Sequence, residues 1–166
     1  MQELVERMIA NIEGTAGTYE EVLATEREKQ RAIVASDIEA LTRVVAREEE
    51  LMARAGRLEA ERAELRRLLA AADARLGPAP RLADIRGLAA GPARARLAQG
   101  RERLVGLASQ INEVNRVNFQ LLRGAINLVR GILEEVFGAD GAPATYDASG
   151  RHDAAPHAAA CVNQVL

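Results

Sequence analysis

Residues 36–80 read SDIEALTRVVAREEELMARAGRLEAERAELRRLLAAADARLGPAP. Apolar residues recur here at steps of three and four, the spacing of one face of an α-helix. This stripe consists of Leu41, Val44, Val45, Leu51, Ala55, Leu58, Leu65, Leu69 and Ala72. Gly77-Pro78-Ala79-Pro80 ends the pattern, because proline lacks an amide donor and restricts the residue before it. The stretch predicts one long helix over about residues 37–76.

Two features of this segment concern its start and its solvation. Ser36 followed three residues later by Glu39 has the spacing of a capping box, so we expect Ser36 to begin the helix. Glu48 and Arg62 fall on the apolar stripe, which predicts a wide and partly solvated seam rather than a buried ion pair. Glu26 and Lys29 interrupt the preceding stripe in the same way, so we expect the end of that helix to be partly solvated.

Similar stripes flank this helix on both sides. The first covers about residues 4–35, and the last covers about residues 93–137, where Pro92 suits a first helical turn. Residues 81–90 have room for a short helical turn. The sequence therefore predicts an all-α fold, an elongated antiparallel three-helix bundle or coiled coil over 1–137. Residues 138–166 are rich in Ala, Gly, Pro, Asp and Ser, which predicts a disordered, flexible C-terminal tail.

Composition and charge exclude several classes of protein. Aromatic residues make up 2% of the chain and Trp is absent, so sheet folds are disfavoured. The single cysteine allows no internal disulfide, and we find no signal peptide and no apolar run long enough to span a membrane. We expect a cytoplasmic protein with no direct membrane insertion.

The sequence offers little for catalysis or for cofactors. His152, His157 and Cys161 are the nearest approach to a metal-ligand pattern, but they lie in the predicted tail and lack a fourth ligand. A basic cluster suits phosphate in principle, yet no aromatic residues accompany it for stacking on bases. It consists of Arg81, Arg86, Arg94, Arg96, Arg101 and Arg103. We therefore expect no enzyme, no metal, no cofactor and no nucleic-acid partner.

The sharpest local feature is INEVNRVNFQLL, residues 111–122, with asparagines at a spacing of three. In the heptad frame of this helix Asn118 falls on an a position and Asn115 on an e position. A buried asparagine in such a seam sets register at a cost in stability. The alternative is that both side chains offer their amides to a partner.

Beyond these asparagines the helix becomes nearly free of charge, which indicates an apolar face left over for another chain. The predicted partner-binding residues are Asn115, Asn118, Leu121, Leu122, Ala125, Leu128, Val129 and Ile132.

Three motifs, in this order, resemble one known family. They are the segment containing Leu58-Glu59-Ala60-Glu61-Arg62, the Asn-x-x-Asn followed by Leu-Leu in INEVNRVNFQLLRGAINLV, and ATYDASGR at residues 144–151. Over about residues 1–151 the chain resembles the FlgN family of flagellar type III export chaperones. The extension at residues 152–166 departs from the family pattern.

The resemblance implies a chaperone whose clients are the hook-associated proteins of the hook–filament junction. It would bind their C-terminal amphipathic helices, prevent premature assembly and deliver them for export. We expect Tyr146, Asp147 and Gly150 to contact either the client or the flagellar export gate, with an idle turn as the alternative. A different reading of the same chain is a scaffolding coiled-coil protein that forms a homo-oligomer through the apolar face.

Overall fold

The computed structural model describes residues 1–137, and every regular element in that range is an α-helix. The helices are α1 (Gln2–Ala35), α2 (Ile38–Ala72), α3 (Leu82–Leu88) and α4 (Gly91–Phe137). The expected bounds for them were about 4–35, 37–76, 81–90 and 93–137. The chain divides into two compact units, Met1–Leu121 and Leu122–Leu166, and α4 contributes to both. The predicted all-α class is confirmed.

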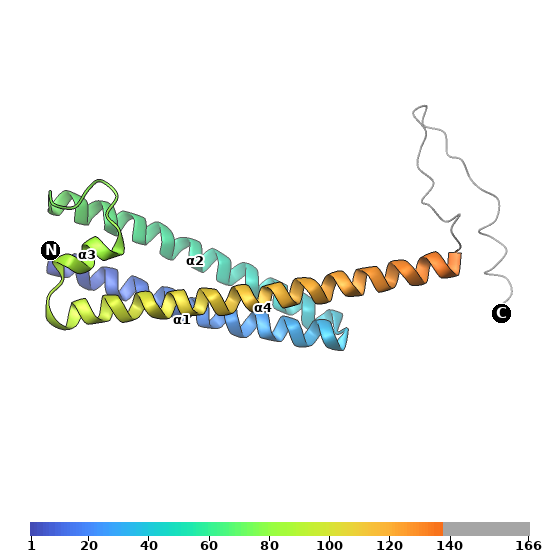
Figure 1. The fold of residues 1–166 in the computed structure, drawn as a ribbon. Helices are drawn as coiled ribbons and strands as arrows, with labels where there is room; N and C mark the ends of the chain where they lie inside the picture. Colours follow the sequence, from blue (N-terminus) through green and yellow to red (C-terminus); the bar gives the residue numbers. More distant parts are fainter. Residues whose placement is uncertain (138–166) are drawn as a thin grey trace, which may run out of the picture. The chain divides into compact units, whose positions relative to one another are not determined.

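The first unit is built from α1, α2, α3 and the first part of α4 (Figure 1). Contacts far apart in sequence fix the directions of these helices. Asn11 and Lys29 of α1 contact Leu58 and Glu48 of α2, in reverse order along the chain. Glu6 and Glu20 of α1 pair with Arg96 and Arg103 of α4, in the same order. Helix α2 is therefore antiparallel to α1, whereas α4 runs parallel to it.

The turn between α1 and α2 uses a different capping residue from the predicted one. Ser36 adopts a left-handed conformation (φ 54°, ψ 32°) and ends α1. Asp37 is extended, and its carboxylate accepts a hydrogen bond from the Ala40 amide at 2.9 Å. A residue that reverses the chain in the left-handed region cannot also take the extended conformation of an N-cap. The prediction of Ser36 as the cap was wrong by one residue.

Helix α2 ends at Ala72, four residues before the expected end at about residue 76. Asp73 is extended, and its carboxylate accepts hydrogen bonds from the Arg75 backbone amide and Nε, both at 2.9 Å. These contacts stabilise a non-helical turn, which competes with one more turn of helix. The Arg75 contact also lowers the pKa of Asp73 to about 2.

The apolar core of the first unit consists of two clusters. The larger one joins all four helices, with Met8 and Ile9 of α1, Leu69 of α2, Ile85 of α3 and Leu97 of α4 almost completely buried. The smaller one packs Ala16 and Leu23 of α1 against Leu107 of α4. The short helix α3 thus closes one end of the unit by placing Ile85 in the main core.

Helices α1 and α4 approach each other closely at Gly100. A Cβ atom added there would lie 2.6 Å from Ile12 Cγ2, closer than real atoms pack. A glycine in mid-helix normally costs roughly 1 kcal/mol of helix stability. Here it allows the close helix contact that buries Ile12.

Candidate partner-binding surface on α4

The second part of α4, residues 122–137, exposes every side chain. Its large apolar side chains include Leu128, Val129 and Ile132, which are 66%, 56% and 50% exposed. At roughly 100° per residue, the apolar side chains occupy about half of the helix circumference. They are Leu122, Ala125, Ile126, Leu128, Val129, Ile132, Leu133, Val136 and Phe137.

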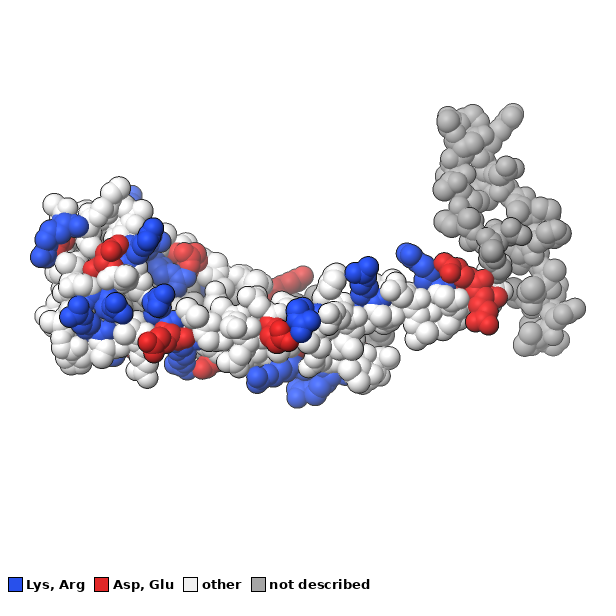
Figure 2. Space-filling model, viewed as in Figure 1, with Lys and Arg blue, Asp and Glu red and all other residues white. Residues whose placement is uncertain are grey.

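The half of the helix circumference opposite these residues carries polar residues and glycines. Arg123, Asn127, Arg130 and Glu134 fall on it by the same helical spacing. Gly124 and Gly131 also fall there, and a Cβ atom at either position would meet nothing within 4 Å. In Figure 2 the charged side chains of this stretch lie along its upper edge and at its far end, and white surface lies below them. The segment is an amphipathic helix whose apolar face is uncovered in the described part of the chain.

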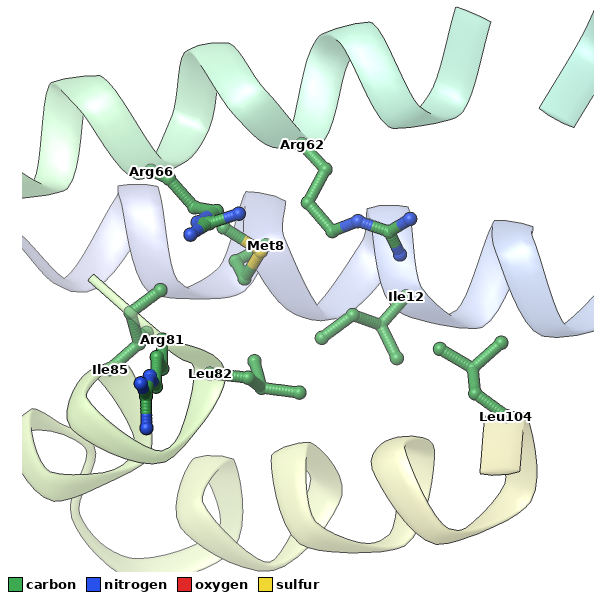
Figure 3. Close-up of a pocket in the computed structure, with 8 residues that line it drawn as sticks. All are labelled: Met8, Ile12, Arg62, Arg66, Arg81, Leu82, Ile85 and Leu104. Atoms are coloured by element: carbon green, nitrogen blue, oxygen red, sulfur yellow. The ribbon is translucent and has the colours of Figure 1, made fainter. Parts of the chain in front are cut away.

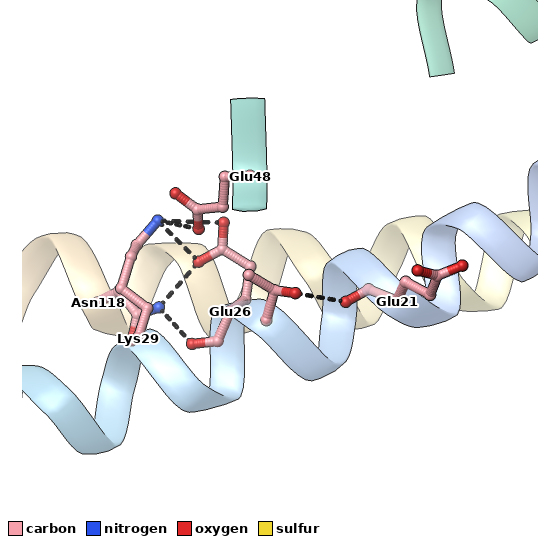
Figure 4. A network of polar contacts seen from close by, with 6 residues as sticks. Glu21, Glu26, Lys29, Glu48 and Asn118 are labelled. Carbon is pink, nitrogen blue, oxygen red and sulfur yellow. Dashed lines mark hydrogen bonds and ion pairs between the residues drawn. The ribbon is translucent and has the colours of Figure 1, made fainter. Parts of the chain in front are cut away.

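The first unit holds a buried polar node where α1, α2 and α4 meet (Figure 4). Asn118 of α4 is 1% exposed, and its Nδ2 donates to the Glu26 carbonyl oxygen and to Glu26 Oε2, both at 2.9 Å. The Lys29 ammonium lies 3.2 Å from Glu26 Oε2 and 2.6 Å from Glu48 Oε1 of α2. Lys29 therefore forms ion pairs with two carboxylates, Glu26 on α1 and Glu48 on α2.

Burial and neighbouring charges shift the pKa values of Glu48 and Lys29 in opposite directions. Burial raises the pKa of Glu48 above its ordinary value, although the hydrogen bond and positive charge of Lys29 lower it. Burial lowers the pKa of Lys29, but its hydrogen bonds to Glu48 and Glu26 and their charges outweigh this and raise it. Glu26 is buried, whereas Lys29 and Glu48 are half-buried, with side chains 15% and 20% exposed. The seam is thus partly solvated at Lys29 and Glu48, as expected, but the burial of Glu26 and the ion pairs that join the three residues were not predicted.

The node also decides between the two interpretations of Asn118. The residue lies in the seam and its amide donor is used within the chain, as expected for a register-setting asparagine. Its Oδ1 has no hydrogen-bond partner in the described part of the chain. The structure contradicts the prediction that Asn118 offers its amide to a partner, because the side chain is buried against α1.

Comparison with known proteins gives one match. The family described as FlgN protein matches residues 1–154, which is most of the chain.

The chain belongs to the FlgN family.

FlgN proteins are flagellar export chaperones, and they act by binding flagellar proteins. No curated protein and no solved structure matches the chain.

The other predicted partner-binding residues of this FlgN-family chain are distributed along α4. Asn115, Leu122 and Ala125 are exposed, together with Leu128, Val129 and Ile132, whereas Leu121 is half-buried. Tyr146, Asp147 and Gly150 lie outside the described residues, as do His152, His157 and Cys161. In the range 1–137, acidic, cysteine and histidine side chains form no group able to hold a metal ion.

Several exposed apolar residues on the same face were not among the predicted ones. Phe119, Ile126 and Phe137 are 66%, 60% and 64% exposed. Steps of three and four from Leu122 lead to Ile126, Leu133, Val136 and Phe137, so the spacing itself was the signal. None of the four described helices has an apolar stretch that would cross a membrane.

Proposed function

We propose that this chain captures the C-terminal amphipathic helices of hook–filament junction proteins on the exposed apolar face of residues 122–137. The observation that carries the proposal is a helical segment whose whole apolar half is in contact with water. An amphipathic helix binds such a surface through anchors spaced at i, i+3, i+4 and i+7. Capture would keep a client monomeric in the cytoplasm before export.

The main contacts proposed are Leu122, Ala125, Leu128, Val129 and Ile132, and Asn115 and Leu121 of the first unit are proposed as further contacts. Buried in the node, Asn118 would act indirectly, by holding α4 in register against α1. Tyr146, Asp147 and Gly150 belong to the proposal as a contact to the client or to the export gate.

Calorimetric titration of the full chain with a peptide of a junction protein's C-terminal helix tests the main surface. We expect saturable binding with a negative heat-capacity change, because apolar surface becomes buried. Val129→Asp with Ile132→Asp should weaken binding by about 100-fold or more, since each charge faces an apolar contact. Circular dichroism should show unchanged helix content, because both positions are exposed.

A matched control places the same two charges on the opposite half of the same segment. Asn127→Asp with Gly131→Asp should leave the affinity within about twofold, because neither position belongs to the apolar face. Equal losses in both variants would refute the proposed surface. A tight dimer of the free chain that no client peptide dissociates would favour the scaffolding alternative.

The tail contact needs its own experiment. Tyr146→Ala should reduce binding of the loaded chaperone to the purified cytoplasmic domain of the export gate, while client affinity changes little. If both interactions survive the substitution unchanged, Tyr146 has no role in either contact.

A further inference from the structure

Two hollows lie on either side of Leu82, at the end of the first unit that α3 closes. The larger one is an open hollow of about 330 Å³, lined by Arg81 and by residues of α1, α2, α3 and α4 (Figure 3). The smaller one has a volume of about 220 Å³ and lies between α3 and α4. Leu82 lines both hollows and forms the ridge between them.

The floors of both hollows are apolar. Met8, Ile12 and Ile85 line the larger one and are almost completely buried, and the half-buried Leu104 completes it. Leu97, which is 1% exposed, lines the smaller one together with Ala83. An apolar side chain inserted into either hollow would therefore leave water and contact the edge of the main core.

The polar lining of both hollows is entirely arginine. Arg62, Arg66 and Arg81 line the larger hollow, and Arg86 and Arg101 line the smaller one. In Figure 3 Arg62 and Arg66 extend from α2 toward Met8 and Ile12, with Arg81 at the other side. No acidic residue lines either hollow.

Neighbouring arginines on α4 show what a paired guanidinium does in this protein. Arg96 forms ion pairs with Glu6 and Glu13, and Arg103 forms one with Glu20. Their charges are thus used to join α4 to α1.

The arginines that line the hollows form fewer ion pairs than these two. Arg81, Arg86 and Arg101 form no ion pair with any residue in the range 1–137. Arg66 donates its Nε to the Pro80 carbonyl oxygen at 2.7 Å, and Arg62 pairs with the exposed Glu59. The guanidinium donors of at least three side chains remain for a ligand.

The shape and chemistry of the two hollows select among possible ligands. No aromatic side chain lines them, so they offer no platform for stacking of bases. Two small apolar hollows divided by one leucine fit two separate apolar side chains better than one small molecule. Arginine binds carboxylates with two parallel hydrogen bonds, which gives both strength and orientation.

We infer that the α3 end of this chain binds an acidic segment of a partner protein. Two apolar side chains of that segment occupy the hollows on either side of Leu82, and its carboxylates pair with Arg81, Arg86 and Arg101. This surface shares no residue with the face of residues 122–137, so it gives the chaperone a second site, independent of client capture.

Fluorescence anisotropy on the full chain tests the inference with a defined probe. The probe is a fluorescein-labelled peptide that contains Glu-Leu-Glu-Glu-Leu-Glu twice. We expect saturable binding that weakens about tenfold when Arg81→Gln and Arg86→Gln are combined, because two charge-assisted contacts are lost. Both arginines are exposed, so the fold should survive.

Matched controls separate this site from general charge effects and from the client surface. Arg31→Gln with Arg43→Gln removes the same charge from exposed positions near the α1–α2 turn, and should leave probe affinity unchanged. Val129→Asp with Ile132→Asp should also leave it unchanged. A probe that loses its affinity through this last pair binds the client face instead, which would overturn the inference while supporting the proposed client surface.

Two changes to the probe test its acidic contacts and its apolar contacts separately. Replacing its glutamates with glutamine, or its leucines with alanine, should each weaken binding at least fivefold. An alanine probe that binds equally well would show that the hollows are not used. Equal competition by single-stranded DNA or by phosphatidylglycerol vesicles would assign the arginines to a general anion surface and also reject the inference.

Discussion

Helix α4 consists of two parts that differ in what their side chains do. In Gly91–Leu121, Leu97 and Leu107 are buried in the core, Asn118 is bonded to α1, and arginines form ion pairs with α1 glutamates. In residues 122–137 no side chain is buried, although the apolar stripe is wider. Within one helix, then, the more apolar part is the more exposed one. Exposing such a surface to water costs free energy, which supports the proposed capture of a client helix there.

Removing one apolar side chain from each part of α4 should have very unequal effects on stability. Leu97→Ala should destabilise the protein by about 2–5 kcal/mol, because the buried leucine leaves a cavity. Ile132→Ala should change stability by less than about 0.5 kcal/mol, since its side chain is exposed. Urea unfolding followed by circular dichroism measures both. Similar losses would mean that residues 122–137 are packed in solution.

The second prediction compares the two asparagines. Asn118→Ala should destabilise the first unit by about 1–3 kcal/mol, because the Glu26 carbonyl and carboxylate lose a donor in a buried place. Asn115→Ala at an exposed position should have almost no effect on stability. If thermal unfolding shows no difference between the two variants, the node does not hold α4 against α1.

The third prediction concerns two glycines of the same helix. Gly100→Ala should destabilise by about 1–2 kcal/mol, since the clash with Ile12 outweighs the gain in helix propensity. Gly131→Ala should stabilise the helix by up to about 1 kcal/mol, because its added Cβ meets nothing. Denaturant midpoints of the two variants should therefore move in opposite directions. A stabilising Gly100→Ala would show that α1 and α4 are less closely packed than described.

The smallest expected effect is a dependence of stability on pH. The pKa of Glu48 is raised in the folded protein, so its contribution is greatest below the ordinary value of 4.5 and is lost as pH rises through the folded value. The pKa of Asp73 is lowered to about 2, so its contribution is present above 3.8 and is lost as pH falls toward 2. Melting temperatures of Glu48→Gln and Asp73→Asn across pH 2–7 should deviate from the parent chain in opposite senses.

The sequence was informative where a regular spacing decides the structure. The apolar stripe of residues 36–80 predicted a long helix, and the separate stripe of the last helix continued past Leu122 onto the exposed face. It did not predict the ion pairs of Lys29 with Glu26 and Glu48, since each of these residues looks like a solvent-facing one when taken alone. Only the packing of three helices brings them together. The same limit applied to Asn118, for which spacing allowed two roles and the contact to Glu26 decided between them.

Lys29 has a consequence for how the molecule can be cut. It is the one lysine of the sequence, in a chain that otherwise uses arginine. An endoproteinase specific for lysine therefore has a single cleavage site, the peptide bond between Lys29 and Gln30. That bond lies inside α1, beside a side chain held by Glu26 and Glu48. The rate of this one cut reports how often the end of the first unit opens.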